Sequence, residues 1–141
     1  MFVEIKSRLL ESEFKELLSY SIFPDESRLI HTINAYQSND NSEIYAYEVD
    51  DVYIGIVGVQ MMEGAILEIL HLSVQPNFRG LGYGRGLLVE LIEMKKPNRL
   101  FAETDQDAVD FYRNVGFTVV SLGEKYPGVE RFECTYDTHE D

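Results

Sequence analysis

The chain has 141 residues, 45% of them hydrophobic and 12% aromatic, so we expect one domain over residues 1–141 whose core needs no disulfide and no structural metal. Its one cysteine, Cys134, has no partner for an internal bridge, which suits a reducing compartment. The net charge of −13 argues against nucleic acid as a partner, because nucleic-acid binders place Lys and Arg against phosphates. An acidic surface also favours cationic partners such as amines, although solubility alone is a sufficient reason for it.

No stretch of the sequence predicts export or membrane insertion. Residues 1–6 lack the basic start and the following apolar run of a secretion signal. The apolar runs stay well short of the roughly 18 residues that cross a bilayer. We therefore expect a cytoplasmic protein with no membrane partner.

The first half of the chain predicts a strand, two helices and three further strands. Residues 2–6 alternate as a strand does, and apolar residues at helical spacing predict a helix over residues 8–21. Pro24 opens a second helix, which the polar run at residues 38–41 ends. Three strand-like runs follow, at residues 44–49, 52–62 and 65–74.

The second half alternates between helices and strands. A leucine-rich stripe at residues 87–92 predicts a helix, and a short strand follows at residues 99–103. A further helix over residues 106–115 is closed by Gly116. Two final strands are expected, at residues 117–122 and 131–136. The resulting order, β-α-α-β-β-β-α-β-α-β-β, predicts an α/β domain with a mixed sheet.

A glycine-rich turn joins the strand at residues 65–74 to the leucine-rich helix. Its glycines stand at alternate positions, Gly80, Gly82, Gly84 and Gly86. These glycines let the backbone approach a ligand closely, and free amides at the start of a helix attract an anion. The guanidinium of Arg79 can bind the same anion with two N–H groups. The spacing excludes two common phosphate motifs. No lysine follows these glycines as in a P-loop, and Arg85 or Leu87 interrupts the dinucleotide pattern.

Two segments resemble the GNAT N-acetyltransferase superfamily. Residues 72–88 are similar to its acetyl-coenzyme A (acetyl-CoA) motif, Arg/Gln-x-x-Gly-x-Gly/Ala, in which Arg79, Gly82 and Gly84 fill the defined positions. Residues 108–117 resemble the family's Ala-x-x-x-Tyr-x-x-x-Gly-Phe segment. The resemblance covers most of the chain, although the first 40 residues match only in helical character. It implies the GNAT acyl-CoA N-acyltransferase fold, with a central, mostly antiparallel sheet flanked by helices.

The resemblance also implies a reaction, the transfer of an acetyl group from acetyl-CoA, a cosubstrate, to a primary amine of a small molecule or peptide, without a metal. It implies that the backbones of Leu72 and Val74 contact the pantetheine arm and the acetyl oxygen. Tyr112 matches the family's general acid, which protonates the departing thiolate, but it also belongs to an apolar helix stripe, so a plain core role stays open. The pyrophosphate is expected to bind Arg79, Gly80, Leu81, Gly82, Tyr83 and Gly84.

Glu68 and His71 are the candidates for the base that deprotonates the amine. An alkylamine is almost wholly protonated near neutrality, so its attack requires a proton acceptor. Glu68 stands alone in an apolar strand, where related sequences often carry a glutamate that acts through water. On a regular strand, side chains three residues apart point to opposite faces. Only one of the two is therefore expected to face the acceptor, unless a bulge intervenes.

Other positions are assigned weaker roles. Where the family often has an asparagine, this chain has Asp105, which we expect to cap the following helix. His31 and Tyr36 are expected to be a surface and a core residue, and His139 in the acidic tail is expected to have no role. No motif identifies the acceptor, and a homodimer stays open. The alternative function is a catalytically silent GNAT-fold module that binds a CoA species as a sensor or scaffold.

Overall fold

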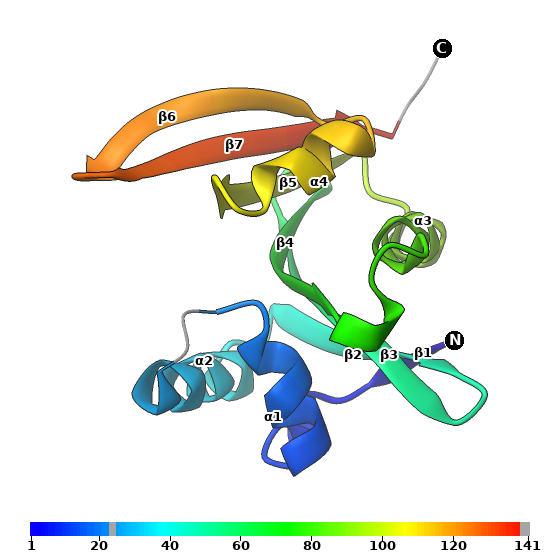
Figure 1. Ribbon diagram of the computed structural model, residues 1–141. Coiled ribbons are helices and arrows are strands. Elements are labelled where there is room, and N and C mark those ends of the chain that lie inside the picture. Colours follow the sequence, from blue (N-terminus) through cyan, green and yellow to red (C-terminus); the bar gives the residue numbers. More distant parts are fainter. Residues whose placement is uncertain (23–24, 139–141) are drawn as a thin grey trace.

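The computed structural model describes residues 1–22 and 25–138, which form one mixed sheet with helices on both faces (Figure 1). The order of strands and α-helices is the predicted one. The strands are β1 (Phe2–Glu4), β2 (Ser42–Val49), β3 (Val52–Met62), β4 (Ile66–Val74), β5 (Arg99–Asp105), β6 (Thr118–Tyr126) and β7 (Val129–Asp137). The α-helices are α1 (Ser12–Ser19), α2 (Glu26–Ser38), α3 (Tyr83–Lys95) and α4 (Val109–Asn114).

The strands are arranged in the order β1-β2-β3-β4-β5-β7-β6. All neighbours pair antiparallel except β4 and β5, which run parallel because α3 carries the chain back between them. A mostly antiparallel sheet flanked by helices was the predicted fold class, and it is confirmed. No helix within the described residues is long and apolar enough to span a bilayer.

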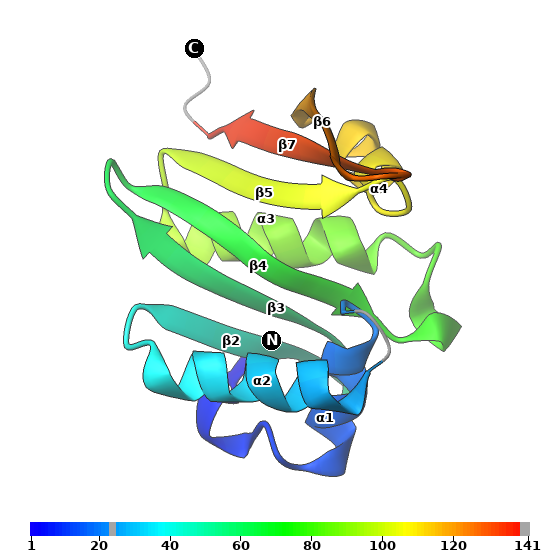
Figure 2. The ribbon, with the colours of Figure 1, turned by 90° about the vertical axis from the view of Figure 1, so that its left-hand side faces the viewer.

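The two faces of the sheet have separate hydrophobic cores. Helices α1 and α2 cover one face, here named the α2 face, and α3 and α4 cover the other, the α3 face (Figure 2). Alternation along β2 shows the division, because Ile44 and Ala46 pack under the α2 face while Tyr45 packs under the α3 face. The core of the α2 face ends at β4, so no helix among the described residues covers the strands from β5 to β7 on that side (Figure 2).

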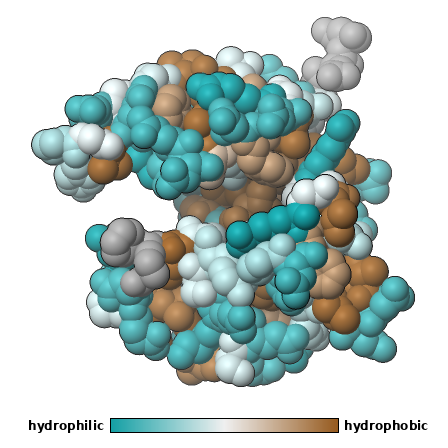
Figure 3. Space-filling model, viewed as in Figure 1, coloured by the Kyte–Doolittle hydropathy of each residue, from teal (hydrophilic) through white to brown (hydrophobic). Residues whose placement is uncertain are grey.

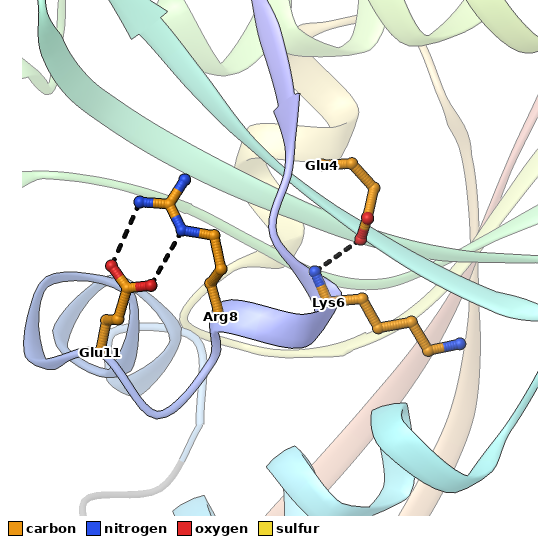
Figure 4. A network of polar contacts seen from close by, with 4 residues as sticks. All are labelled: Glu4, Lys6, Arg8 and Glu11. Atoms are coloured by element: carbon orange, nitrogen blue, oxygen red, sulfur yellow. Dashed lines mark hydrogen bonds and ion pairs between the residues drawn. The ribbon is translucent and has the colours of Figure 1, made fainter.

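The segment that joins β1 to α1 shortens the first helix. The predicted helix over residues 8–21 is wrong at its start, because a 3-10 turn occupies Lys6–Arg8 and α1 begins at Ser12. Arg8 reaches forward to Glu11 with two hydrogen bonds of 2.9 and 3.2 Å, and the Lys6 amide donates to the Glu4 carboxylate at 2.5 Å (Figure 4). These local polar contacts hold the turn where sequence periodicity predicted a helix.

The start of α2 and the length of the last hairpin also differ from the sequence-based expectation or extend it. Pro24 lies outside the described residues, and α2 begins at Glu26, with the Asp25 carboxylate accepting the Ser27 amide at 2.9 Å as an N-cap. The last hairpin is longer than predicted, since β6 continues to Tyr126. Its two strands therefore project as an arm beyond β5 (Figure 1).

Tyr36 joins α2 to the sheet by lying directly over a glycine of β3. A Cβ built on Gly58 would stand 1.7 Å from the Tyr36 hydroxyl oxygen and 2.6 Å from its Cζ. The missing side chain of Gly58 is therefore what lets the ring lie against the sheet. Tyr36 is only 2% exposed, so the predicted core role is confirmed.

Gly58→Ala is expected to lower the free energy of unfolding by about 2–3 kcal/mol, because the added methyl overlaps an aromatic ring that packing holds in place. Urea denaturation measures the change. Gly86→Ala is the control, since no atom lies within 4 Å of the added Cβ, and a helical Gly→Ala change stabilises by up to about 1 kcal/mol. A Gly58→Ala protein as stable as the wild type would contradict this packing.

Candidate active site

The strands β4 and β5 separate in the middle of the sheet. They pair only where Ile66–Glu68 meets Arg99–Phe101, and each then continues without the other. The surface is hollowed on the α2 face, between the half that holds β6 and β7 and the half that holds α1 and α2 (Figure 3). The region between the diverging strands is here named the β4/β5 opening.

Beyond Glu68, the edge of β4 that faces this opening pairs with no other strand among the described residues. The Gln75 amide donates to the Ile54 carbonyl at 2.8 Å, so Ser73, two residues earlier, also directs its backbone toward β3. Leu72 and Val74 alternate with these residues and direct their backbones away from β3, toward the opening.

The glycine-rich turn ends at the start of α3. Gly80 and Gly82 have φ of 76° and 87°, a left-handed conformation that favours glycine. The first amide bonded inside α3 is that of Gly86, which donates to the Gly82 carbonyl at 3.0 Å. The three amides before it have no helical acceptor, and Gly82 provides no side-chain cap. The turn thus presents free N–H groups at the positive end of the α3 dipole.

The side chains of the turn have other contacts. Gly84 packs against α4, since a Cβ there would lie 2.8 Å from the Phe111 ring. Tyr83 meets the ring of Phe78 edge-on at 6.0 Å, and Leu81 is 67% exposed. Within this turn, Gly84 therefore has a packing role in addition to any role in ligand approach.

Arg79 bridges the turn to two other elements. Its Nε donates to the Val74 carbonyl at 2.9 Å, and its guanidinium carbon lies 5.4 Å from the centre of the Tyr20 ring. One backbone acceptor at the opening is thereby occupied by the protein itself. Arg79 belongs to the same turn as the free amides and adds a positive charge to it.

Tyr112 lies in the hydrophobic core on the α3 face of the sheet. The ring is 6% exposed and contacts Phe111 and Phe117, each at 5.1 Å between ring centres. Within the described part of the chain, its hydroxyl has no hydrogen-bond partner, and the hydroxyl oxygen is not fully buried. Burial raises the pKa of Tyr112 above the ordinary value for a phenol, so the hydroxyl keeps its proton throughout the neutral range.

Glu68 and His71 lie on the same face of the sheet, which corrects the expectation for a regular strand. Glu68 pairs with Gln60 and His71 pairs with Gly58, and these two β3 residues are two positions apart. The register shift between Gly58 and Val59 leaves Leu70 as an extra residue in β4. Because of this bulge, both side chains point to the α2 face, opposite Tyr112.

A chain of amides holds Glu68 in place. The Gln60 Nε2 donates to the Glu68 carboxylate at 2.7 Å, and the Asn39 Nδ2 donates to Gln60 Oε1 at 3.1 Å. A carboxylate only accepts, so this contact fixes which end of the Gln60 amide faces it. One carboxylate oxygen is engaged, and the other has no partner within the described residues. Glu68 is therefore oriented by the end of α2 through Gln60.

His71 has a different environment from Glu68. Its Nδ1 lies 2.6 Å from the Tyr36 hydroxyl oxygen. Burial lowers the pKa of His71 to about 4, and burial also raises the pKa of Tyr36. Both groups are therefore neutral near pH 7, and His71 is a weak base compared with a free imidazole.

Residues 8–117 match the model of the Acetyltransferase (GNAT) family. The chain belongs to the GNAT family. Among curated proteins it is similar to the N-alpha-acetyltransferase RimI of Mycobacterium tuberculosis (strain ATCC 25618 / H37Rv), 39% identical over 62 residues, which are 42% of this chain and 39% of that protein. The chain spans less than two thirds of the length of the curated relatives it matches.

Solved structures share the fold. A GNAT family acetyltransferase from Elizabethkingia anophelis with acetyl-CoA bound is similar over 97% of both chains, with a TM-score of 0.70 and 15% identity. An aminoglycoside 6'-N-acetyltransferase complexed with coenzyme A is similar over 100% of this chain and 98% of that one, with a TM-score of 0.78 and 14% identity. At these identities the likeness shows the GNAT fold.

The structure also places residues to which the sequence analysis gave weaker roles. The Asp105 carboxylate accepts the amides of Asp107 and Ala108 at 3.0 and 3.1 Å and so holds the turn before α4. The expected helix cap is wrong in position, because the N-cap of α4 is Ala108, which makes no side-chain cap. His31 is exposed, as predicted, and His139 lies outside the described residues. The sequence analysis missed Gln60, and it missed the contact of Tyr36 with His71. Both follow from strand register and bulges, for which the sequence has no direct signal.

Proposed function

We propose that this GNAT protein is an N-acetyltransferase that moves the acetyl group of acetyl-CoA to a primary amine of a small molecule or peptide. The observation that carries the proposal is the β4/β5 opening, where, among the described residues, β4 has no strand neighbour beyond Glu68, with Tyr112 on one face of the sheet and Glu68 on the other. A donor and an acceptor can then meet from opposite sides of the sheet. The coenzyme-bound GNAT structures and the name of the RimI relative support the same reaction class.

The proposed reaction is a direct attack. Glu68 takes one proton from the ammonium form of the acceptor, directly or through water, and leaves a free lone pair on nitrogen. The nitrogen bonds to the thioester carbon, and the carbon–sulfur bond breaks as the tetrahedral intermediate collapses. Tyr112 gives its proton to the departing sulfur and regains one from the second amine proton through water, while Glu68 releases its proton to solvent. The products are an acetamide and coenzyme A.

The proposed coenzyme site runs along the turn and β4. The free amides before Gly86, with Arg79 beside them, would hold the pyrophosphate. The backbones of Leu72 and Val74 would pair with the pantetheine amides as a strand neighbour does. The acetyl group would then lie in the β4/β5 opening, within reach of both proposed catalytic side chains.

Gly82→Asn is expected to weaken acetyl-CoA binding tenfold or more, because its side chain would stand where the pyrophosphate approaches the turn. Asparagine tolerates the left-handed conformation at φ 87°, whereas a β-branched residue does not. Titration calorimetry measures the dissociation constant.

Gly64→Asn is the matched control for that variant. Gly64 has φ 78° and no atom within 4 Å of an added Cβ, but it lies in the turn between β3 and β4. The control is expected to bind acetyl-CoA as the wild type does. Equal affinities for all three proteins would remove the turn from the coenzyme site.

A screen of amines tests the proposed function. Thiol release from acetyl-CoA is measured with polyamines, aminoglycosides, amino acids and peptides with free N-termini. At least one class is expected to stimulate release above the rate in buffer. Acetyl-CoA binding without stimulated release by any amine would favour the silent binding module instead.

A further inference from the structure

The contact of Tyr36 with His71 determines which ring nitrogen of His71 is protonated. Tyr36 is 2% exposed, and His71 Nδ1 is the one hydrogen-bond partner of its hydroxyl among the described residues. If Nδ1 carried the proton, the phenol proton would be left without an acceptor in the core, at a cost of about 1–3 kcal/mol. The phenol therefore donates and Nδ1 accepts, which places the imidazole proton on Nε2.

The protonated nitrogen is accessible and lies on the α2 face. His71 lies on the α2 face, on the same side of β4 as Glu68, because of the bulge at Leu70. Within the described residues, Nε2 of His71 has no hydrogen-bond partner, and this atom is not fully buried. An N–H donor whose orientation is fixed by Tyr36 is thus presented on the same face of the sheet as the carboxylate of Glu68.

We propose that His71 is a neutral hydrogen-bond donor that binds an oxygen of the acceptor, and that Tyr36 is the positioning residue that keeps the proton on His71 Nε2. This inference rests on the proposed acetyltransferase function. It specifies the acceptor as an amine with a carbonyl or hydroxyl oxygen close to the nitrogen. An N–H donor repels an ammonium group, so His71 and Glu68 select two different parts of one molecule.

The arrangement also separates His71 from the proton transfer. The lone pair of Nδ1 is engaged by Tyr36, and Nε2 has no free lone pair while it carries the proton. Glu68 alone of the two candidates then has a free acceptor oxygen toward the amine. His71 contributes binding of the acceptor, which predicts an effect on the acceptor KM rather than on kcat.

Nitrogen-15 NMR tests the protonation of the ring without any substrate. The wild type is expected to show a proton-free Nδ1 and a protonated Nε2 for His71. Tyr36→Phe, which keeps the ring over Gly58 but removes the phenol, is expected to release the ring into a mixture of both forms. A wild-type protein with the proton on Nδ1 would overturn the proposal, as would a Tyr36→Phe protein whose His71 is unchanged.

Two substitutions of His71 by residues with amide side chains distinguish a hydrogen-bond donor role of His71 from a role as the base. In His71→Gln, the side-chain N–H reaches the position of Nε2, whereas in His71→Asn the shorter amide retains a partner for Tyr36 but does not reach that position. The probes are alaninamide and its hydrocarbon isostere, 3-methylbutan-2-amine. For alaninamide, His71→Asn is expected to raise KM about tenfold while His71→Gln stays within about threefold of wild type. For the isostere, all three proteins are expected to have similar KM values.

The outcomes separate this inference from the proposed function. A large loss of kcat in both amide variants would make His71 the base and overturn the proposal, and so would equal KM values for alaninamide in all three proteins. If other amines of the screen are acetylated but alaninamide is not, the assigned acceptor class is wrong and the acetyltransferase stands. If no amine is acetylated, the function fails, whereas the NMR result still decides the state of His71.

Discussion

Tyr112→Phe is expected to reduce kcat by about a hundredfold while acetyl-CoA binds almost as tightly as to the wild type. A lost general acid typically costs 10²–10⁴, and the low end is expected because a thiolate with a pKa of about 8.5 leaves partly unaided. Burial raises the pKa of Tyr112, so the neutral, proton-donating form persists as pH rises. The wild-type rate should therefore show no alkaline loss from this residue in the neutral range. Steady-state kinetics across pH and calorimetry measure the two effects.

The stability of the same variant separates the acid role from a core role. No hydrogen bond within the described residues is lost with the hydroxyl, so Tyr112→Phe is expected to melt within a few degrees of the wild type. Tyr112→Ala, by contrast, opens a cavity between Phe111 and Phe117 and is expected to lose about 3–5 kcal/mol. A Tyr112→Phe enzyme with full turnover would leave the ring with a packing role only.

Glu68→Gln is expected to lower turnover about a hundredfold near pH 7, and progressively less as pH rises toward the pKa of the amine. The base is needed only while the acceptor amine is protonated, and a free alkylamine has a pKa of about 10. The glutamine still accepts the Gln60 amide at the position of the 2.7 Å contact, so the fold and acetyl-CoA affinity should barely change. The measurement is kcat/KM for one amine from pH 6 to pH 10.

A second substitution controls for this interpretation. Gln60→Leu leaves the carboxylate in place but removes the donor that orients it. Its loss of turnover is expected to be smaller than that of Glu68→Gln and to follow the same trend with pH. A Glu68→Gln enzyme whose pH profile matches the wild type would remove Glu68 from the mechanism.

Local sequence patterns were sufficient to predict the order of elements. A run rich in β-forming residues predicted β3 at its observed bounds, and the leucine stripe predicted α3. The helix predicted over residues 8–21 failed at its start because the Arg8–Glu11 contact stabilises a turn that apolar periodicity does not detect. Patterns of three to four residues thus predict helices well and their first turns poorly.

The candidate site depends on contacts between strands, and these were harder to predict. The bulge at Leu70 moves His71 to the face of Glu68, although alternation alone separates the two side chains. Gln60 becomes a partner of Glu68 only once the register of β3 against β4 is known. Tyr36 fits the pattern of a core residue, and nothing in its helix indicates that its hydroxyl reaches His71. Register depends on the whole sheet, which a single segment does not encode.

The most direct test of the proposed acetyltransferase is the fate of a labelled acetyl group. The protein is incubated with acetyl-CoA carrying carbon-13 in the acetyl group, together with the amine that gives most thiol release, and the products are analysed by mass spectrometry. We predict a labelled acetamide of that amine and one released coenzyme A per acetamide, with both products reduced about a hundredfold in Tyr112→Phe. Labelled acetate as the sole product, or the same thiol release with and without the amine, would contradict the account.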